Sequence, residues 1–427
     1  MGPGRLFLGK GGVSMAYAGN TAPAAIVFRA VRQAVLLTGL LAFTATSAHS
    51  QGAATADDTA RFLAGMPVAA DSPLAPLTTD PSWQRHQSQL DAAFRNVDAR
   101  QLSKMRAWST ANVTVRQPVL FYMFSGPDFL HANAFFPDAD TYVLAALEPT
   151  GSIPDLQKVQ RGSISGVLGH LRGTLRSSLA FSFFITKEMR EELSAGGLKG
   201  TLPILYVYLA RSGKTIREVA LVNLDGKGNV QSGDSAKSGA RGVRIVFTSG
   251  EGRPQTLYYF TTNIANDGFR RSGFAAFCES LGIGDSFLKS ASYLPHQGGF
   301  TQVRDFLLDR SATILQDDSG IPLARFDAKK WTFRTFGRNV TPIGIFPEYH
   351  QPKLKELHQK GPENRLDFGF GYRHRPHEAS LFLATNRDLQ RPVETTSAAP
   401  ATSGSAAARA EPASPQTPRP SSRDLPN

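Results

Sequence analysis

Uninterrupted apolar runs alternate with helical periodicity in the first half of the chain. The runs "VLFYMF" at 119–124 and "YVLAAL" at 142–147 are short and apolar on both faces, which predicts two buried strands. Apolar residues recur at helical spacing in 80–97 and 155–179. We therefore expect a helix before this pair, with Asp80 as its N-cap and Pro81 as its first residue, and another after it, whose helical spacing continues at 185–193. The order of strand, polar loop, short helix and strand predicts a Rossmann-like βαβ start.

Four β-rich runs follow, separated by Gly, Ser, Asp and Lys: "LPILYVYLA", "TIREVALVNL", "GVRIVFTS" and "QTLYYFTTNI". Strands joined by such short connections must mostly be antiparallel. The remaining pattern predicts helices at 270–281 and 302–315, a strand at 286–294, and short aromatic-rich runs at 331–337, 341–346, 366–372 and 380–385. We therefore expect an α/β fold whose mixed sheet has a Rossmann-like βαβ start, antiparallel middle strands and helices on the sheet faces.

The first fifty residues have the order of a secretory signal peptide. Four basic residues and no acidic ones lead into the apolar run "AVLLTGLLAF", which small residues follow in "TATSAHSQ". The apolar run is too short to span a bilayer, so no stable transmembrane span is expected after cleavage; an uncleaved N-terminal anchor is the alternative. We therefore expect a periplasmic or secreted protein with a signal peptide at 1–50.

Composition divides the rest of the chain into three parts. Residues 51–80 are rich in Ala, Asp, Thr and Pro and are predicted to be a linker, and residues 81–391 are predicted to form one α/β domain. In 392–427, Pro, Ser, Thr and Ala make up 25 of the 36 residues and no aromatic residue occurs. Such a tail cannot bury enough apolar surface to offset its chain entropy, so we expect disorder there.

Charge and cysteine content limit the classes of binding partner and of covalent cross-link that can be expected. Only four of the 47 Lys and Arg residues, and none of the 35 Asp and Glu residues, lie in the first fifty, so the remainder keeps a diffuse surplus of eight positive charges. Without a Lys/Arg block, this surplus suits an anionic envelope component and argues against nucleic acid. Cys278 is the only cysteine, so no internal disulfide can form; its place on an apolar helical face predicts a packing role.

Carboxylates follow several of the predicted elements. Asp128 ends the loop "SGPD", Glu148 follows the second strand, and Asp317 and Asp318 follow the helix predicted at 302–315. His131 lies one helical turn after Asp128. Carboxylates with separated pKa values can perform general acid–base hydrolysis, and three with a histidine can hold a metal. These five residues are the candidate catalytic residues, although Asp at a helix start or in a D-D-S-G turn is also ordinary capping.

Other motifs carry less weight. Glu148 lies 22 residues after Gly126, as the ribose-binding carboxylate of a dinucleotide fold would, but one glycine followed by Pro127 lacks the amides that hold a phosphate. No cofactor-binding residue is therefore predicted, and any metal or cofactor stays open. Ser286 and Lys289 match S-x-x-K, which chance explains. His374 and His377 flank an arginine, which disfavours metal binding.

Three segments together resemble a family of exported bacterial proteins of unknown function: "FSGPDFLHANAFFPDADTYVLAALEPTGSIPD", "FLKSASYLPH" and "ILQDDSGIP". The resemblance covers roughly residues 80–391. It implies bacterial export and one folded unit, and it carries no established activity.

Two function classes follow from these observations. The preferred one is an exported, envelope-associated protein that binds a small ligand or envelope partner at a rim made by "SGPD", "LEP" and "QDDSGIP". The alternative is a carboxylate- or metal-dependent hydrolase that acts on an envelope glycan or ester through Asp128 with Glu148 or Asp317 and Asp318. A purely structural alternative is a domain that only docks to an anionic surface, whose binding would weaken with salt.

Overall fold

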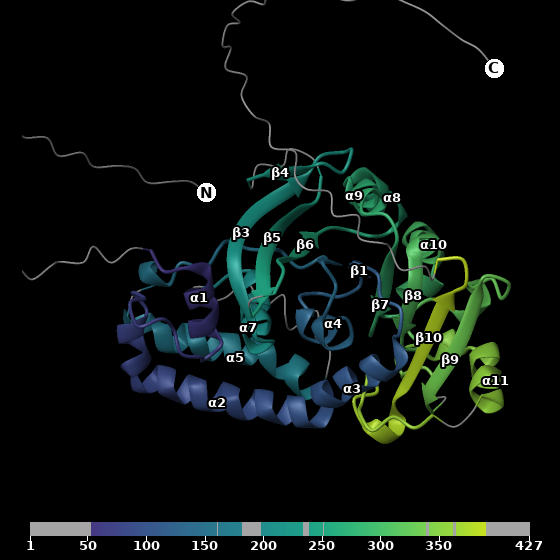
Figure 1. Ribbon diagram of the computed structural model, residues 1–427, viewed down its shortest axis with the longest axis horizontal. Coiled ribbons are helices and arrows are strands. Elements are labelled where there is room, and N and C mark those ends of the chain that lie inside the picture. The colour runs from purple at the N-terminus through teal and green to yellow at the C-terminus, as the bar shows by residue number, and fades with distance from the viewer. Residues whose placement is uncertain are drawn as a thin grey trace, which may run out of the picture. The chain divides into compact units, whose positions relative to one another are not determined.

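The computed structural model describes residues 53–159, 161–181, 198–233, 239–250, 252–338, 341–361 and 364–389. The described residues form a mixed sheet of ten strands in the order β4-β3-β5-β6-β2-β1-β7-β8-β10-β9 (Figure 1). The predicted α/β class with a mixed sheet is therefore confirmed. The predicted signal peptide, the C-terminal tail and the helical continuation expected at 185–193 lie outside the described residues.

The centre of the sheet is parallel. Its strands, in spatial order, are β6 (Gln255–Thr261), β2 (Thr141–Ala146), β1 (Val119–Tyr122), β7 (Gly284–Leu288) and β8 (Ser311–Gln316). The short helix α4 (Phe129–Phe135) connects β1 to β2, which pair in parallel. Because all five strands run the same way, the loops after their carboxyl ends lie along one edge of the sheet.

Antiparallel strands extend the sheet on both sides. Beyond β6 lie β5 (Arg241–Ser249), β3 (Lys214–Leu224) and the short β4 (Val230–Ser232). Beyond β8 lie β10 (Ser380–Asn386) and β9 (Trp331–Gly337). The antiparallel pairing predicted for the middle runs is confirmed for β3, β5 and β6.

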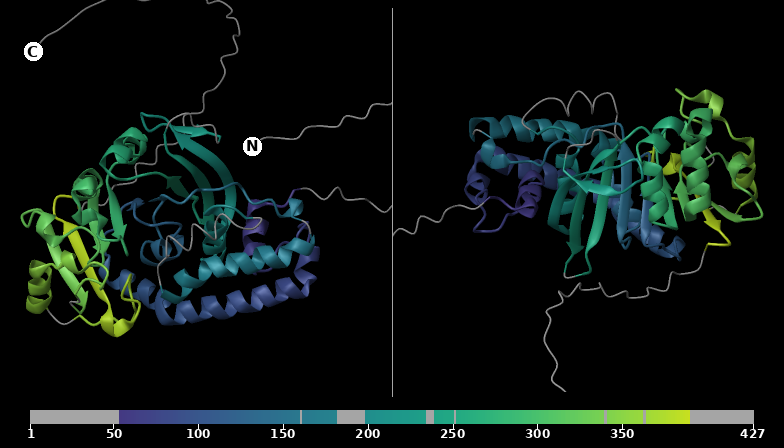
Figure 2. Two further views of the ribbon diagram at one scale, coloured as in Figure 1. Left: turned by 180° about the vertical axis from the view of Figure 1, so that it is seen from behind. Right: turned by 90° about the horizontal axis from the view of Figure 1, so that it is seen from above.

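Two hydrophobic cores enclose the sheet. In β1, Leu120 and Tyr122 belong to one core, whereas Val119 and Phe121 belong to the other. The first core contains residues of α4 and of α1 (Ala56–Leu63), α2 (Pro81–Val97), α3 (Ser103–Asn112), α5 (Ile164–Phe181) and α7 (Leu202–Arg211). The second contains residues of α8 (Asn266–Arg271), α9 (Phe274–Ser280), α10 (Thr301–Arg310) and α11 (Pro352–Lys360). Figure 2 shows α2 and α5 running side by side.

The run "LPILYVYLA" is a helix, not the predicted strand. All nine residues are buried, so the segment has no polar face, and the sequence shows no helical spacing of apolar residues. A fully apolar run cannot be assigned to strand or helix from its pattern alone. Pro203 fits the first turn of α7, where a missing N–H costs nothing.

The predicted linker at 51–80 is wrong for its described part. Phe62 and Leu63 of α1 are buried in the first core, and the Asp57 carboxylate accepts a hydrogen bond from the backbone N–H of Ile216 in β3. The polar composition of this segment gave no indication of α1, an amphipathic helix of only eight residues. The N-cap predicted at Asp80 is confirmed, because its side chain accepts from the N–H of Ser82.

Other boundaries also differ from the expectation. The helix predicted at 302–315 ends at Arg310, and β8 follows at once; the strand predicted at 286–294 ends at Leu288. Gly273, with φ 75°, divides the helix predicted at 270–281. The runs at 341–346 and 366–372 form turns, because their glycines and prolines interrupt pairing.

Cys278 packs in the second core, as its helical position predicted. It is fully buried, and burial raises the pKa of its thiol well above the usual value. No helix among the described residues combines the length and the apolar character that a membrane span requires.

Candidate functional site

Asp128 and His131 meet at the start of α4, as predicted. The Oδ1 atom of Asp128 lies 3.3 Å from the backbone nitrogen of His131, whose N–H it caps, and 2.8 Å from His131 Nδ1. Both side chains are buried. Asp128 is therefore a capping residue, and it also orients an imidazole inside the protein.

Lys289, at the end of β7, completes a buried charge cluster. Its Nζ lies 2.7 Å from Asp128 Oδ2 and 3.2 Å from His131 Nδ1. The Tyr122 hydroxyl, at the end of β1, donates to the same Oδ2 over 2.9 Å. We call Tyr122, Asp128, His131 and Lys289 the lysine cluster; it joins β1, α4 and β7 through side chains that are at most 4% exposed.

Burial and pairing act against each other in the lysine cluster. Burial alone would raise the pKa of Asp128, but the charges of His131 and Lys289 outweigh it and hold that pKa below its usual value. Burial lowers the pKa of His131, and the charge of Asp128 opposes this shift. Burial also lowers the pKa of Lys289, and Asp128 opposes this shift. An ionised carboxylate held in this way is a poor general acid.

Asp317 lies at the neighbouring strand end and holds two turns together. It accepts hydrogen bonds from the backbone N–H of Ser290 at 2.9 Å and of Ser319 at 3.0 Å, and from the Ser319 hydroxyl at 2.5 Å. Its charge acts on Lys289 and on Tyr122. The structure thus brings Asp317 beside the lysine cluster. Burial raises the pKa of Asp317.

Asp318 faces a different partner from Asp317. Its Oδ2 atom accepts a hydrogen bond of 2.5 Å from the hydroxyl of Tyr293. Burial, together with the adjacent Asp317 carboxylate, raises the pKa of Asp318 to about 7. A pKa near 7 lies in the range where a side chain can exchange protons at neutral pH, so Asp318 is the candidate carboxylate best suited to proton transfer.

Glu148 occupies the end of β2, and its neighbours belong to β6. Its backbone carbonyl accepts hydrogen bonds from Tyr259 and Thr261, and its side chain is buried. Since β6 pairs with β2 on the side away from β1, Glu148 is placed toward the opposite flank from Lys289 and Asp317.

The backbone after β7 is strained. Ser290, Ser292 and Tyr293 have φ of 52°, 52° and 54°, in the left-handed region that non-glycine residues rarely adopt. Each such residue costs on the order of 1–3 kcal/mol and persists only where its surroundings impose it. Here the constraints are specific: Asp317 holds Ser290 N–H, the Ser319 hydroxyl accepts from Ala291 N–H at 2.7 Å, and Tyr372 donates to Ser290 O at 3.1 Å.

Aromatic side chains gather around this strained turn. The rings of Tyr293 and Tyr349 stack with centroids 5.1 Å apart and planes 6° apart, and His296 and Phe346 pack against both. Tyr349 is partly exposed, whereas Tyr293 is buried. The Ser290 hydroxyl is buried and has no hydrogen-bond partner among the described residues. We call the loops 289–297, 317–320, 343–350 and 371–373 the aromatic rim.

Several candidates from the sequence do not contribute to this site. Ser286 bonds to Ser311 rather than to Lys289, so the S-x-x-K match identified the lysine with the wrong partner. Gly126 has φ 57° and is a turn glycine. Within the described residues, no group of three His, Cys, Asp or Glu side chains is arranged to hold a metal ion. Tyr122, Lys289, Ser290 and Tyr293 were not among the predicted site residues. The S-x-x-K match, which was discounted, was the sequence signal that lay near them.

Comparisons of the chain with protein-family models, curated proteins and solved structures gave no match.

We predict that Asp128→Asn destabilises the protein, because the asparagine can still cap α4 but leaves the Lys289 ammonium buried without a counter-charge. The expected loss in free energy of unfolding is about 3–5 kcal/mol, measured by urea denaturation. The double variant Asp128→Asn/Lys289→Met should lose less than the single variant, since no buried charge remains unpaired. A loss under about 1 kcal/mol for Asp128→Asn would contradict a structural ion pair.

Asp318 should make stability fall as the pH rises. Its folded pKa of about 7 exceeds the unfolded value of about 3.9, so its contribution is fully present below pH ~4 and is lost as pH rises through ~7. In Asp318→Asn, the free energy of unfolding should fall less steeply between pH 5 and 8, by on the order of 2–4 kcal/mol over that interval. Asp309→Asn, at an exposed carboxylate, is the control. Equal slopes in wild type and Asp318→Asn would refute the assignment.

Proposed function

We propose that this protein is an exported envelope protein that binds a glycan at the aromatic rim. The observation that carries the proposal is the strained turn Ser290–Tyr293, which follows the buried lysine cluster and is contacted by the three other loops of the rim. Strain of this kind clusters at ligand-binding and catalytic sites. A fold without disulfides gains no stability from three left-handed non-glycine residues, so a functional reason for them is favoured.

The position of the rim supports the same proposal. It follows the carboxyl ends of β7 and β8 in the parallel part of the sheet, where open α/β sheets bind their ligands. Nucleotide binding is not proposed, because "SGPD" offers one glycine and a proline where a phosphate needs backbone amides.

The side chains of the rim fit a sugar ligand. Aromatic rings offer rigid apolar faces, and their hydroxyl groups offer polar edges, which together match a pyranose ring. Tyr349 and Tyr372 are partly exposed, and Gln297 donates to the Tyr349 hydroxyl at 3.1 Å. The Ser290 hydroxyl, buried and without a partner among the described residues, is a further polar group that a ligand could satisfy. The expected export and the modest positive surplus place such a protein near envelope glycans.

The test is binding of soluble envelope glycan fragments and N-acetylglucosamine oligomers to the purified protein, by calorimetry and thermal shift. We expect Tyr349→Ala to weaken binding at least tenfold, because it removes a partly exposed ring and its hydrogen bond with Gln297. Tyr258→Ala, at a partly exposed tyrosine of β6, is the matched control and should bind as wild type does. Binding only to anionic surfaces, weakened by salt and unchanged in Tyr349→Ala, would favour the docking alternative instead.

One observation favours hydrolysis as a second candidate function. The pKa of Asp318, about 7, suits a general acid or base at neutral pH, whereas Asp128 is committed to Lys289. If the rim is catalytic, Asp318→Asn should abolish turnover of a glycan or ester while it leaves binding within a few-fold of wild type. Release of reducing ends or of acid from the fragments that bind is the measurement. Turnover that survives in Asp318→Asn would exclude this role.

A further inference from the structure

The helices α2 and α5 run side by side (Figures 1 and 2). A groove lies between them, away from the aromatic rim. Its volume is about 340 Å³, within the range of small-molecule sites. None of its lining residues belongs to the aromatic rim. Its lining consists of apolar side chains, three arginines and two amides. The apolar residues are Leu90, Ala93, Leu179 and Ala180, the arginines are Arg100, Arg172 and Arg176, and the amides are Gln89 and Asn96. Arg100 belongs to the π-helical turn Asp98–Leu102.

Among the described residues, no carboxylate lines this groove, and none forms an ion pair with its three arginines. Arg100 donates to the carbonyl oxygens of Leu179 and Ala180 at 2.8 and 3.3 Å. Arg172 Nη1 lies 2.9 Å from His86 Nδ1, while His86 Nε2 lies 2.8 Å from the Leu63 carbonyl. His86 is therefore a neutral partner, and burial lowers its pKa to about 4. Arg176 is exposed and forms no ion pair with the described residues.

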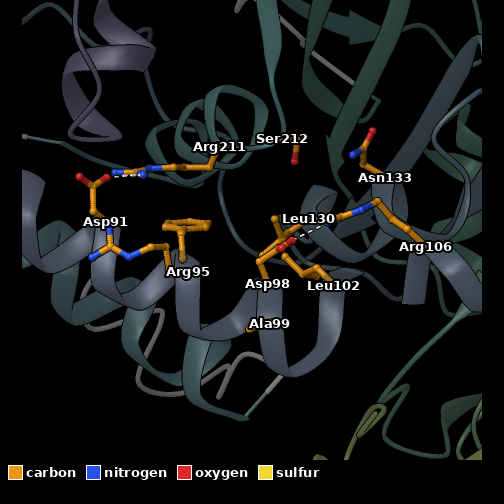
Figure 3. A pocket seen from close by; sticks show the side chains of 11 residues that line it. Asp91, Arg95, Asp98, Ala99, Leu102, Arg106, Leu130, Asn133, Arg211 and Ser212 are labelled. Atoms are coloured by element: carbon orange, nitrogen blue, oxygen red, sulfur yellow. Dashed lines mark hydrogen bonds and ion pairs between the residues drawn. The ribbon is translucent and has the colours of Figure 1, made fainter. Parts of the chain in front are cut away.

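On the other flank of α2, arginines form ion pairs with carboxylates. The cavity in Figure 3 contains Arg106, 2.6 Å from Asp98, and Arg211, 2.6 Å from Asp91. The same helix thus borders one cavity whose cations are largely paired and one groove whose cations are not. Uncompensated guanidinium groups beside apolar surface favour an anion that also carries an apolar part.

We propose that the groove between α2 and α5 binds a single-chain anionic amphiphile. The acyl chain lies on Leu90, Ala93, Leu179 and Ala180, and the carboxylate or phosphate group accepts hydrogen bonds from Arg172 and Arg176. The guanidinium fork matches both anions, and one bound chain removes apolar surface from water while it neutralises the arginines.

The test is calorimetric titration of the full protein with laurate and dodecyl phosphate, each as monomers below its micelle concentration. One molecule should bind, and Arg176→Gln should weaken both ligands about tenfold, since a charge-assisted hydrogen bond is lost. Arg270→Gln, at an exposed arginine of α8, is the matched control and should bind as wild type does. Ala93→Glu, which places a carboxylate in the groove, should abolish binding.

Three outcomes would overturn the proposal. Dodecyl maltoside that binds as tightly as laurate would show that the arginines do not select an anion. Inorganic phosphate that binds equally well would show that the apolar floor contributes nothing. Binding to anionic vesicles without binding to monomeric laurate would identify a membrane-docking surface instead of a site for one chain.

Discussion

The buried ion pair between Lys289 and Asp128 is the interaction on which the centre of this structure depends. An ammonium group removed from water costs several kcal/mol unless a carboxylate and further hydrogen bonds replace its hydration. Here Asp128 supplies the carboxylate, and Tyr122 and His131 satisfy that carboxylate in turn. Because these four residues come from β1, α4 and β7, the pair fixes the relative positions of three elements.

The strained turn after β7 follows from that constraint. Lys289 is drawn inward to Asp128, and the next residue must reverse direction at once to let Ser290 N–H reach Asp317. Gly371 lies close to the same carboxylate: a Cβ atom there would come within 2.0 Å of Asp317 Oδ2. The lysine cluster, the strained turn and the contact of Gly371 with Asp317 are therefore linked through shared residues. A ligand at the aromatic rim would bind to loops that are already ordered.

Sequence patterns predicted those parts of the fold whose burial is periodic or one-sided. The strands β1, β2, β3 and β5 and the cap at Asp80 depend on local chemistry, which an apolar run or an Asp-Pro pair displays. The helix α7 was not predicted because it is buried on every side and its apolar residues therefore show no helical periodicity. The helix α1 was not predicted because it has few apolar residues. Asp317 was grouped with Asp128 because both follow regular elements, but Lys289 could not be paired with Asp128 from sequence, since 161 residues separate them and pairing is a tertiary property.

The change in the role of Asp128 shows why the candidate residues divide as they do. A carboxylate after a strand has one appearance in sequence, whether it caps a helix, pairs with a lysine or transfers a proton. In this fold the neighbouring groups set the pKa of each carboxyl group. Asp128 lies against Lys289, and its pKa is held below the usual value. Asp318 has a tyrosine hydroxyl and a second carboxylate as neighbours, and its pKa is raised to about 7. Two acidic residues at the same edge of one sheet are thereby separated in pKa by the side chains that surround them.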